Sequence, residues 1–260
     1  LIMNLKETFL DKFNLFVEKK SSEERVKKLL KKLLPYKINT NLVRIGEKND
    51  GGYLVPEDFE GIKINYSAGV GMLTKFEADL INNYSIYSKM LDYNEIDRSI
   101  IPNGCDFIKK KLSLRNNSEE ISINNWLDTN DKEIMLKLDI EGGEYQVLSE
   151  ISHENMNKIR ILIIEFHNLR DLRSAFFLSF FENLIEKLES YFYVCHVHIN
   201  NTSNIKKIGK LKIPDMLEVT LIKKNRVKNF RKVFSKLPHD LDSKTDINRK
   251  EIFIDKYWYE

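Results

Sequence analysis

Two runs of aliphatic residues in this chain are followed by acidic residues and a histidine, side chains that move protons or bind metal ions. The first run reaches Asp139 and Glu141 and continues into two glycines, and the second is followed by Glu165 and His167. An apolar strand has no structural need for such residues at its end. Carboxylates there can act as a base, hold an amino group or bind a metal, and an imidazole titrates near neutral pH. Both positions are therefore candidate sites of chemistry.

A glycine-containing turn earlier in the chain is suited to holding a ligand. Ser67 is followed by Gly69 and Gly71, which let the backbone approach a bound group closely, although a tight connection between a strand and a helix needs the same glycines. The third glycine of a dinucleotide fingerprint is replaced by Thr74, which disfavours a nicotinamide cofactor. Asp92 lies about 20 residues further on, the spacing of an acid that binds ribose hydroxyls. Together these features indicate a cofactor that contains adenosine.

Histidines near the end of a later strand offer a third group. His196 and His198 alternate with apolar residues, and Asn200 follows them. We expect His198 to lie at the same edge of the sheet as Asp139 and His167. Two imidazoles and a carboxylate are adequate ligands for a divalent metal, but their spacing is no recognised metal signature. The sequence therefore allows a divalent metal at this edge without favouring one.

Short apolar segments that alternate with helical ones predict the fold, a parallel α/β sheet of seven strands. The expected strands are 62–67, 85–91, 105–109, 134–139, 159–165, 191–199 and 216–223. The expected helices between them are 74–84, 144–149 and 172–189. The connection 200–214 is too polar for a crossover helix, and we expect a loop that makes the last two strands antiparallel. In such a sheet ligands bind beyond the carboxyl ends of the strands, where the candidate residues lie.

The sequence predicts three regions along the chain. Residues 1–40 form a helical segment of two helices, the second of which begins after an N-cap at Ser21-Ser22. Residues 41–225 hold the sheet, with a β-hairpin around an Asp-Gly-Gly turn before it. Residues 226–260 are a basic and aromatic extension that we expect to pack on the domain.

Composition excludes several classes of protein. The 260 residues include 42 Lys+Arg and 39 Asp+Glu, and this near balance does not favour a nucleic-acid partner. A hydrophobic content of 42% is enough for a folded core. Cys105 and Cys195 lie in or beside apolar segments, which favours reduced thiols in a cytoplasmic protein. The chain shows neither the ~20 apolar residues of a membrane span nor the pattern of a signal peptide.

The motif around Asp139 also carries a resemblance to a known family. The chain resembles the FkbM family of S-adenosylmethionine-dependent methyltransferases at Lys137-Leu138-Asp139-Ile140-Glu141-Gly142-Gly143-Glu144 and Ile163-Ile164-Glu165-Phe166-His167. The family's stretch reads approximately Lys-Ile-Asp-Ile-Glu-Gly-Ala-Glu, so Gly143 is a small departure. The similarity spans roughly 44–223. Within it, 49–53 and 196–201 look similar to members that modify sugars of surface polysaccharides.

The resemblance implies a class I methyltransferase fold, a Rossmann-like sheet of seven strands with the last one antiparallel. It assigns Ser67, Gly69 and Gly71 to the methionine end of S-adenosylmethionine, and Asp92 to its ribose. Ser67 stands where the common first motif often has an acid. Asp139 is therefore our candidate for holding the amino group of the cofactor.

The expected function is O-methylation of a sugar hydroxyl, in a nucleotide-activated sugar of surface polysaccharide biosynthesis, with S-adenosylhomocysteine as the product. The enzyme must align oxygen, carbon and sulfur and remove the hydroxyl proton. We expect His167 to be the base, Asp139 to orient it or act as the base itself, and His198 to be a second candidate or a hydrogen-bond donor to the substrate. The residues expected to bind the substrate are Glu141, Glu165, Asn200, Arg170 and Tyr53.

Two other interpretations remain open at this point. The nucleophile can be another small molecule, such as a phosphoramidate or an amine, because the motifs do not distinguish these acceptors. A non-catalytic scaffold that only binds the cofactor is the alternative of another class. The sequence is also compatible with a homo-oligomer.

Overall fold

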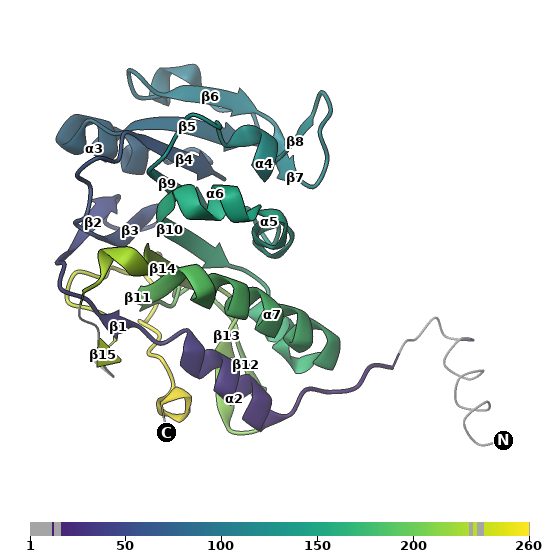
Figure 1. Cartoon of the computed structure of the whole chain (residues 1–260). Helices are drawn as coiled ribbons and strands as arrows, with labels where there is room; N and C mark the ends of the chain where they lie inside the picture. Colours follow the sequence, from purple (N-terminus) through teal and green to yellow (C-terminus); the bar gives the residue numbers. More distant parts are fainter. Residues whose placement is uncertain (1–11, 13–16, 229–230, 233–236, 260) are drawn as a thin grey trace.

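A seven-stranded sheet lies at the centre of the computed structural model, which describes residues 12, 17–228, 231–232 and 237–259 (Figure 1). Each expected strand is present, and each of its ends lies within two residues of the expected position. The strands of this sheet are β4 (Ile64–Ala68), β5 (Tyr87–Asp92), β6 (Asp106–Lys109), β9 (Ile134–Leu138), β10 (Ile159–Phe166), β11 (Phe192–His198) and β14 (Leu217–Lys223). The prediction of a mixed α/β fold with a mostly parallel sheet is confirmed.

The strand order is β11-β14-β10-β9-β4-β5-β6. Parallel pairing joins the five strands from β10 to β6, whereas β14 runs antiparallel to both of its neighbours, as expected for the last two strands. The chain runs outward from β4 through β5 to β6 and then returns to β9 on the other side of β4. This reversal is the switch point at which open α/β sheets bind ligands.

Apolar side chains cover both faces of the sheet, because neighbouring residues of a strand point in opposite directions. Ile161 and Ile163 of β10 belong to a cluster with side chains of the first hairpin and α3, and Leu162 and Ile164 belong to a cluster with α2, α5 and α7. All eight residues of β10 are buried. The helices are α2 (Glu23–Lys32), α3 (Lys75–Tyr84), α4 (Ile123–Trp126), α5 (Glu144–Glu150), α6 (His153–Lys158) and α7 (Ala175–Tyr191).

The helices also follow the sequence pattern. Helices α3, α5 and α7 lie where the sequence predicts helices, although the 3₁₀ helix Leu169–Arg173 occupies the expected start of α7. Helix α2 is the second of the two expected N-terminal helices, and the Ser22 side chain caps it by accepting a hydrogen bond from the Arg25 amide. The first of the two falls chiefly outside the described residues.

Short strand pairs outside the main sheet complete the fold. The expected hairpin is confirmed by β2 (Leu42–Gly46) and β3 (Gly52–Pro56). The connection 200–214 contains a second hairpin, β12 (Ile205–Ile208) and β13 (Leu211–Pro214), so our expectation of a plain loop was wrong there. Its turn has only two residues, and Gly209 supplies the positive φ of 60° that such turns need.

The last described segment, 237–259, lies against the core. Trp258 is fully buried, and its indole nitrogen donates to the carbonyl of Lys212 at 3.1 Å. Leu237 and Ile254 belong to the same apolar cluster as α2 and α7. Both cysteines are free thiols. In the part of the chain that the structure describes, no helix combines the length and the apolar character needed to cross a membrane.

Candidate functional site

A cavity of about 1370 Å³ opens beyond the carboxyl ends of β4, β5 and β9, at the switch point of the sheet. Gly69 and Gly71 line it after β4, Asp92 at the end of β5 and Asp139 after β9. Pockets for drug-sized ligands typically measure roughly 300–1,000 Å³. The cavity is therefore large enough for a cofactor together with part of a second molecule.

The two glycines have different tasks. Gly69 has a φ of +75°, and a Cβ atom there would lie only 1.6 Å from the carbonyl oxygen of Asp139. The close approach of β4 to β9 therefore requires glycine at this position. A Cβ atom at Gly71, where φ is +52°, would meet no atom within 4 Å, and the Gly71 amide donates to Oδ2 of Asp92 at 2.9 Å. The turn thus shapes the wall of the cavity at both glycines.

Asp92 and Ser67 differ in their access to this cavity. Asp92 accepts backbone hydrogen bonds on both oxygens, from Gly71 and, at 2.8 Å, from Asn94. A carboxylate has about four acceptor positions, so Asp92 keeps capacity for ribose hydroxyls. Ser67 is fully buried, hydrogen-bonds to Glu77 and is not among the lining residues. The structure therefore does not place the Ser67 side chain where the sequence analysis expected a cofactor contact.

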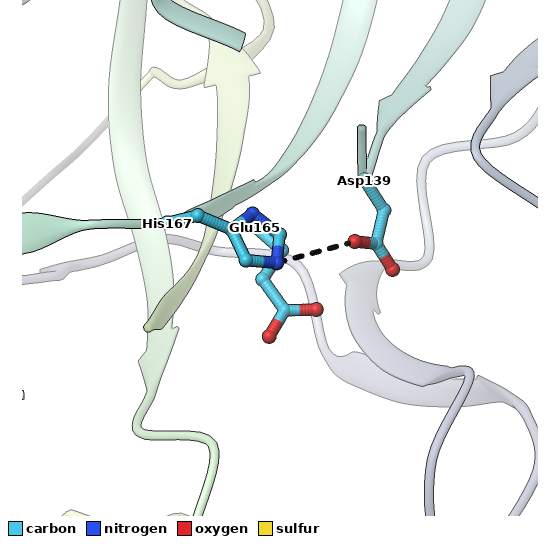
Figure 2. Close-up of side chains that lie close together, drawn as sticks. All are labelled: Asp139, Glu165 and His167. Atoms are coloured by element: carbon cyan, nitrogen blue, oxygen red, sulfur yellow. Dashed lines mark ion pairs between the residues drawn. The ribbon is translucent and has the colours of Figure 1, made fainter. Parts of the chain in front are cut away.

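Asp139, Glu165 and His167 meet beside the cavity (Figure 2). One carboxylate oxygen of each acid and one ring nitrogen of the histidine all lie within 4.8 Å of one another. Nε2 of His167 is 3.8 Å from Oδ1 of Asp139. Parallel pairing of β9 with β10 explains the meeting, because it brings the ends of these strands side by side. We call these three residues the Asp-Glu-His cluster.

Glu144, to which the sequence analysis gave no role, orients the histidine of this cluster. Its Oε1 lies 2.9 Å from Nδ1 of His167 and accepts the amides of Ile140 and Gly142 at 3.0 and 3.2 Å. Tyr145 donates a hydrogen bond to the carbonyl of His167. Glu144 is the first residue of α5. An acid is favourable at the start of any helix, so its presence there does not indicate from the sequence that it orients His167.

Two expected substrate ligands instead hold the other cluster members. The hydroxyl of Tyr53 donates to Oδ2 of Asp139 at 2.8 Å, and the amide of Asn200 donates to Oε1 of Glu165 at 2.8 Å. Tyr53 lines the cavity, whereas Asn200 is buried behind Glu165 and does not line it. Each residue of the cluster therefore has a partner outside it that fixes its position.

Burial dominates the electrostatics of the cluster. Burial raises the pKa of Asp139, and it raises the pKa of Glu165 well above its usual value, with the charges of Asp139 and Glu218 adding to the rise. Burial lowers the pKa of His167, but the hydrogen bond and charge of Glu144 and other nearby carboxylates outweigh it and leave that pKa raised. The cluster therefore keeps protons at a higher pH than the same free side chains would.

His198 lies outside the cluster, among carboxylates of its own. Its Nδ1 is 3.2 Å from Glu218 and its Nε2 is 3.4 Å from Glu251. Burial lowers the pKa of His198, but the hydrogen bond and charge of Glu218, with further acids, raise it to about 9. Its strand neighbour His196 pairs with Asp242 at 3.1 Å. His198 does lie at the same edge of the sheet as Asp139 and His167, because β10 and β11 both run antiparallel to β14, but it does not join their cluster, in which Glu165 is the third member.

The remaining expected substrate ligands differ in availability. Glu141 lines the cavity, its side chain is 88% exposed, and its Oε2 lies 3.6 Å from Nε2 of His167. Arg170 is committed to other residues, since its guanidinium binds Asp215 and Asn168 at 2.9 Å each. Arg170 does not line the cavity.

A buried ion pair on β9 is a further feature that the sequence analysis missed. Nζ of Lys137 lies 3.3 Å from Oε1 of Glu77, and both side chains are almost fully buried. The ammonium group also lies over the rings of Tyr53 and Phe76. The only signal in the sequence is a lysine inside an aliphatic strand. This pair joins the floor of the cavity to α3.

Comparison with protein-family models and with curated proteins finds no match to this chain. The chain is a mixed α/β protein whose mostly parallel sheet is compatible with a Rossmann-like fold, and a cavity opens at the switch point of that sheet. Its function is therefore inferred from the residues of that site.

Proposed function

We propose that this chain is a class I S-adenosylmethionine-dependent methyltransferase that transfers a methyl group to a sugar hydroxyl. The observation that carries the proposal is the cavity at the switch point, with Asp92 on its wall and the Asp-Glu-His cluster beside it. The sheet supports it, because seven strands with an antiparallel seventh strand are what the FkbM resemblance implies.

The lining residues support one orientation of the cofactor in the cavity. Asp92 would accept the ribose hydroxyls, and the turn at Gly69 and Gly71 would lie along the methionine part, as in other open α/β sheets that bind nucleosides. Asp139 would accept the amino group, since its carboxylate lines the same cavity. The reactive methyl group would then lie near the Asp-Glu-His cluster.

The chemistry requires alignment and the removal of one proton. The acceptor oxygen forms a bond to the methyl carbon while the carbon–sulfur bond breaks. The electron pair of the broken bond stays on sulfur, which becomes a neutral thioether. Alignment contributes most, and a base adds typically ~10² to 10⁴-fold. The cluster supplies carboxylates and an imidazole beside the cavity to receive the hydroxyl proton.

An anionic acceptor, such as a nucleotide-activated sugar, suits the cations of this cavity. Lys111 and Arg115 line it, and the Arg115 side chain is 79% exposed, with a carboxylate oxygen of Glu120, which also lines the cavity, 4.0 Å from its guanidinium. Guanidinium and ammonium groups form charge-assisted hydrogen bonds with phosphate. We propose these two residues as the contacts to a phosphate of the substrate, in place of Arg170, which the sequence analysis expected to bind the substrate.

Calorimetric titration with S-adenosylhomocysteine, in the presence of EDTA, tests the cofactor site. We expect micromolar binding that Asp92→Asn weakens at least tenfold and that Asp97→Asn leaves unchanged. Asp97 is a matched control, because it caps an exposed 3₁₀ helix five residues further along the chain. A folded protein that binds no S-adenosylhomocysteine would overturn the proposal.

The acceptor is tested by mass spectrometry. Incubation with S-adenosylmethionine and a panel of nucleotide sugars should add one methyl group to a member of the panel. Cofactor binding without turnover on sugars, phosphoramidates or amines would instead favour the scaffold alternative.

A further inference from the structure

We propose that Asp139, Glu165 and His167 bind one divalent metal ion, of the kind that mixed oxygen and nitrogen ligands hold, with Mn²⁺ as the representative case. The three side chains turn polar atoms toward a common point between the ends of β9 and β10 (Figure 2). The sequence analysis considered His198 as the third ligand, and the structure replaces it with a carboxylate.

The spacing of these atoms suits a shared ion better than direct contact. Nε2 of His167 and Oδ1 of Asp139 are 3.8 Å apart, which is too far for a hydrogen bond. Two ligand atoms that each lie about 2.1 Å from one metal are roughly 3–4 Å apart. The spacing of Nε2 and Oδ1 is therefore that of two atoms that share one ion, and an oxygen of Glu165 lies within 4.8 Å of both.

Each ligand is held by a partner that leaves one of its atoms for the ion. Glu144 occupies Nδ1 of His167, Tyr53 occupies Oδ2 of Asp139 and Asn200 occupies Oε1 of Glu165. Among the described residues, the other atom of each pair has no hydrogen bond. A carboxylate on the far nitrogen of a histidine is the usual outer partner of a metal ligand, because it fixes the tautomer.

Charge supplies a further reason for an ion at this point. Two carboxylates with little exposure face one imidazole, and Glu165 is only 4% exposed. Like charges that are close together away from water repel strongly. A divalent cation offsets both charges, and two carboxylates with one imidazole are ligand types that suit Mn²⁺ and related ions.

The role of the ion rests on the proposed methyltransferase function. A metal-bound alcohol loses its proton more readily, just as metal-bound water does. The proton passes to solvent water, the alkoxide oxygen forms the bond to the methyl carbon, and the broken carbon–sulfur bond leaves neutral S-adenosylhomocysteine. His167 then acts as a ligand rather than as the base.

Titration of the EDTA-treated and desalted full chain with MnCl₂, followed by electron paramagnetic resonance, tests the site directly. We expect one bound Mn²⁺ per chain. Glu165→Gln and His167→Gln should each weaken binding at least tenfold, and Tyr53→Phe, which removes an outer partner, about tenfold. Asp242→Asn, which alters a histidine–carboxylate pair outside the cluster, should leave the affinity unchanged.

The outcomes separate this inference from the proposed function. No Mn²⁺ binding by folded protein, or equal binding by the ligand variants, overturns the metal site. Thermal melting of each variant shows that it is folded, and Glu165→Gln and His167→Gln test the site independently. Mn²⁺ binding without S-adenosylhomocysteine binding would keep the metal site and remove the methyltransferase. The reverse result would remove only the metal.

Discussion

The Asp-Glu-His cluster and the histidines of β11 contain the same residue types at the same end of one sheet, but the surroundings of the two groups differ. Nε2 of His167 makes no hydrogen bond among the described residues, and its nearest ion-pair partner lies 3.6 Å away. His198 has a carboxylate near each ring nitrogen, at 3.2 and 3.4 Å, although its Nε2 makes no hydrogen bond to the described residues either, and His196 pairs with Asp242.

The difference lies in which chain segment supplies the acids. Asp242 and Glu251 come from the tail 237–259, so the pairs on β11 fasten that tail to the edge of the sheet. The Asp-Glu-His cluster instead lies beside the cavity, which Asp139 and its partner Tyr53 line. A histidine beside a carboxylate is therefore a better candidate for chemistry where the group borders a cavity than where it holds a chain segment in place.

Matched Asp→Asn substitutions in the two regions should differ most in turnover. Asp139→Asn should lower kcat by about 10²- to 10⁴-fold, because it removes a carboxylate that binds, orients or accepts a proton at the reacting group. Asp242→Asn should change kcat by a factor of a few at most. Steady-state kinetics with the acceptor found by mass spectrometry measures both. Equal losses in the two variants would mean that the regions do not have separate roles.

Stability should change in opposite directions in the two regions. Asp242→Asn should lower the free energy of unfolding by about 1–3 kcal/mol, because it replaces the buried carboxylate that pairs with His196 by a neutral amide. Glu165→Gln should raise the free energy of unfolding when this is measured in EDTA at pH 8. A carboxyl whose folded pKa is raised costs stability above its unfolded pKa, and the cost grows as the pH rises through the folded value. Urea unfolding measures both changes, and a loss in both variants would contradict the comparison.

A smaller effect should appear in the pH dependence of stability. The folded pKa of His198, about 9, lies above the ordinary 6.5, so its stabilisation is complete below pH 6.5 and is lost as the pH rises through 9. The groups that face it are Glu218, Glu251 and Asp242. Wild-type protein should lose up to about 1.4 kcal/mol per pH unit more than His198→Gln within this window. Parallel unfolding curves from pH 6.5 to 9 would show that His198 does not titrate there.

Much of the fold follows from the sequence because parallel strands buried on both faces are continuous aliphatic runs. The run 161–164 is an example, and it indicates β10 without any alignment. The hairpin of β12 and β13 could not be predicted in this way. Lys206 and Lys207 interrupt its apolar pattern, and the hairpin depends on a two-residue turn at Gly209.

The part of the site that lies at the ends of two neighbouring strands could be predicted from the sequence. Asp139 follows β9 and His167 follows β10, and these two strands are neighbours in the sheet. Oδ1 of Asp139 lies 3.8 Å from Nε2 of His167, as expected for residues at adjacent strand ends. His198 is displaced because β14 inserts between β10 and β11, and strand order is not visible in a hydropathy pattern. Glu218 and Glu251 come from segments whose pattern gave no reason to select them.

The insertion of β14 between β10 and β11 also constrains the order of assembly during synthesis. Strand β11 is made before residues 217–223, yet β14 is its only partner in the seven-stranded sheet. Until β14 emerges, the edges of β10 and β11 present unpaired backbone groups of the kind that join to other chains. A growing chain that stalls between β11 and β14 therefore exposes two strand edges to which other chains can pair.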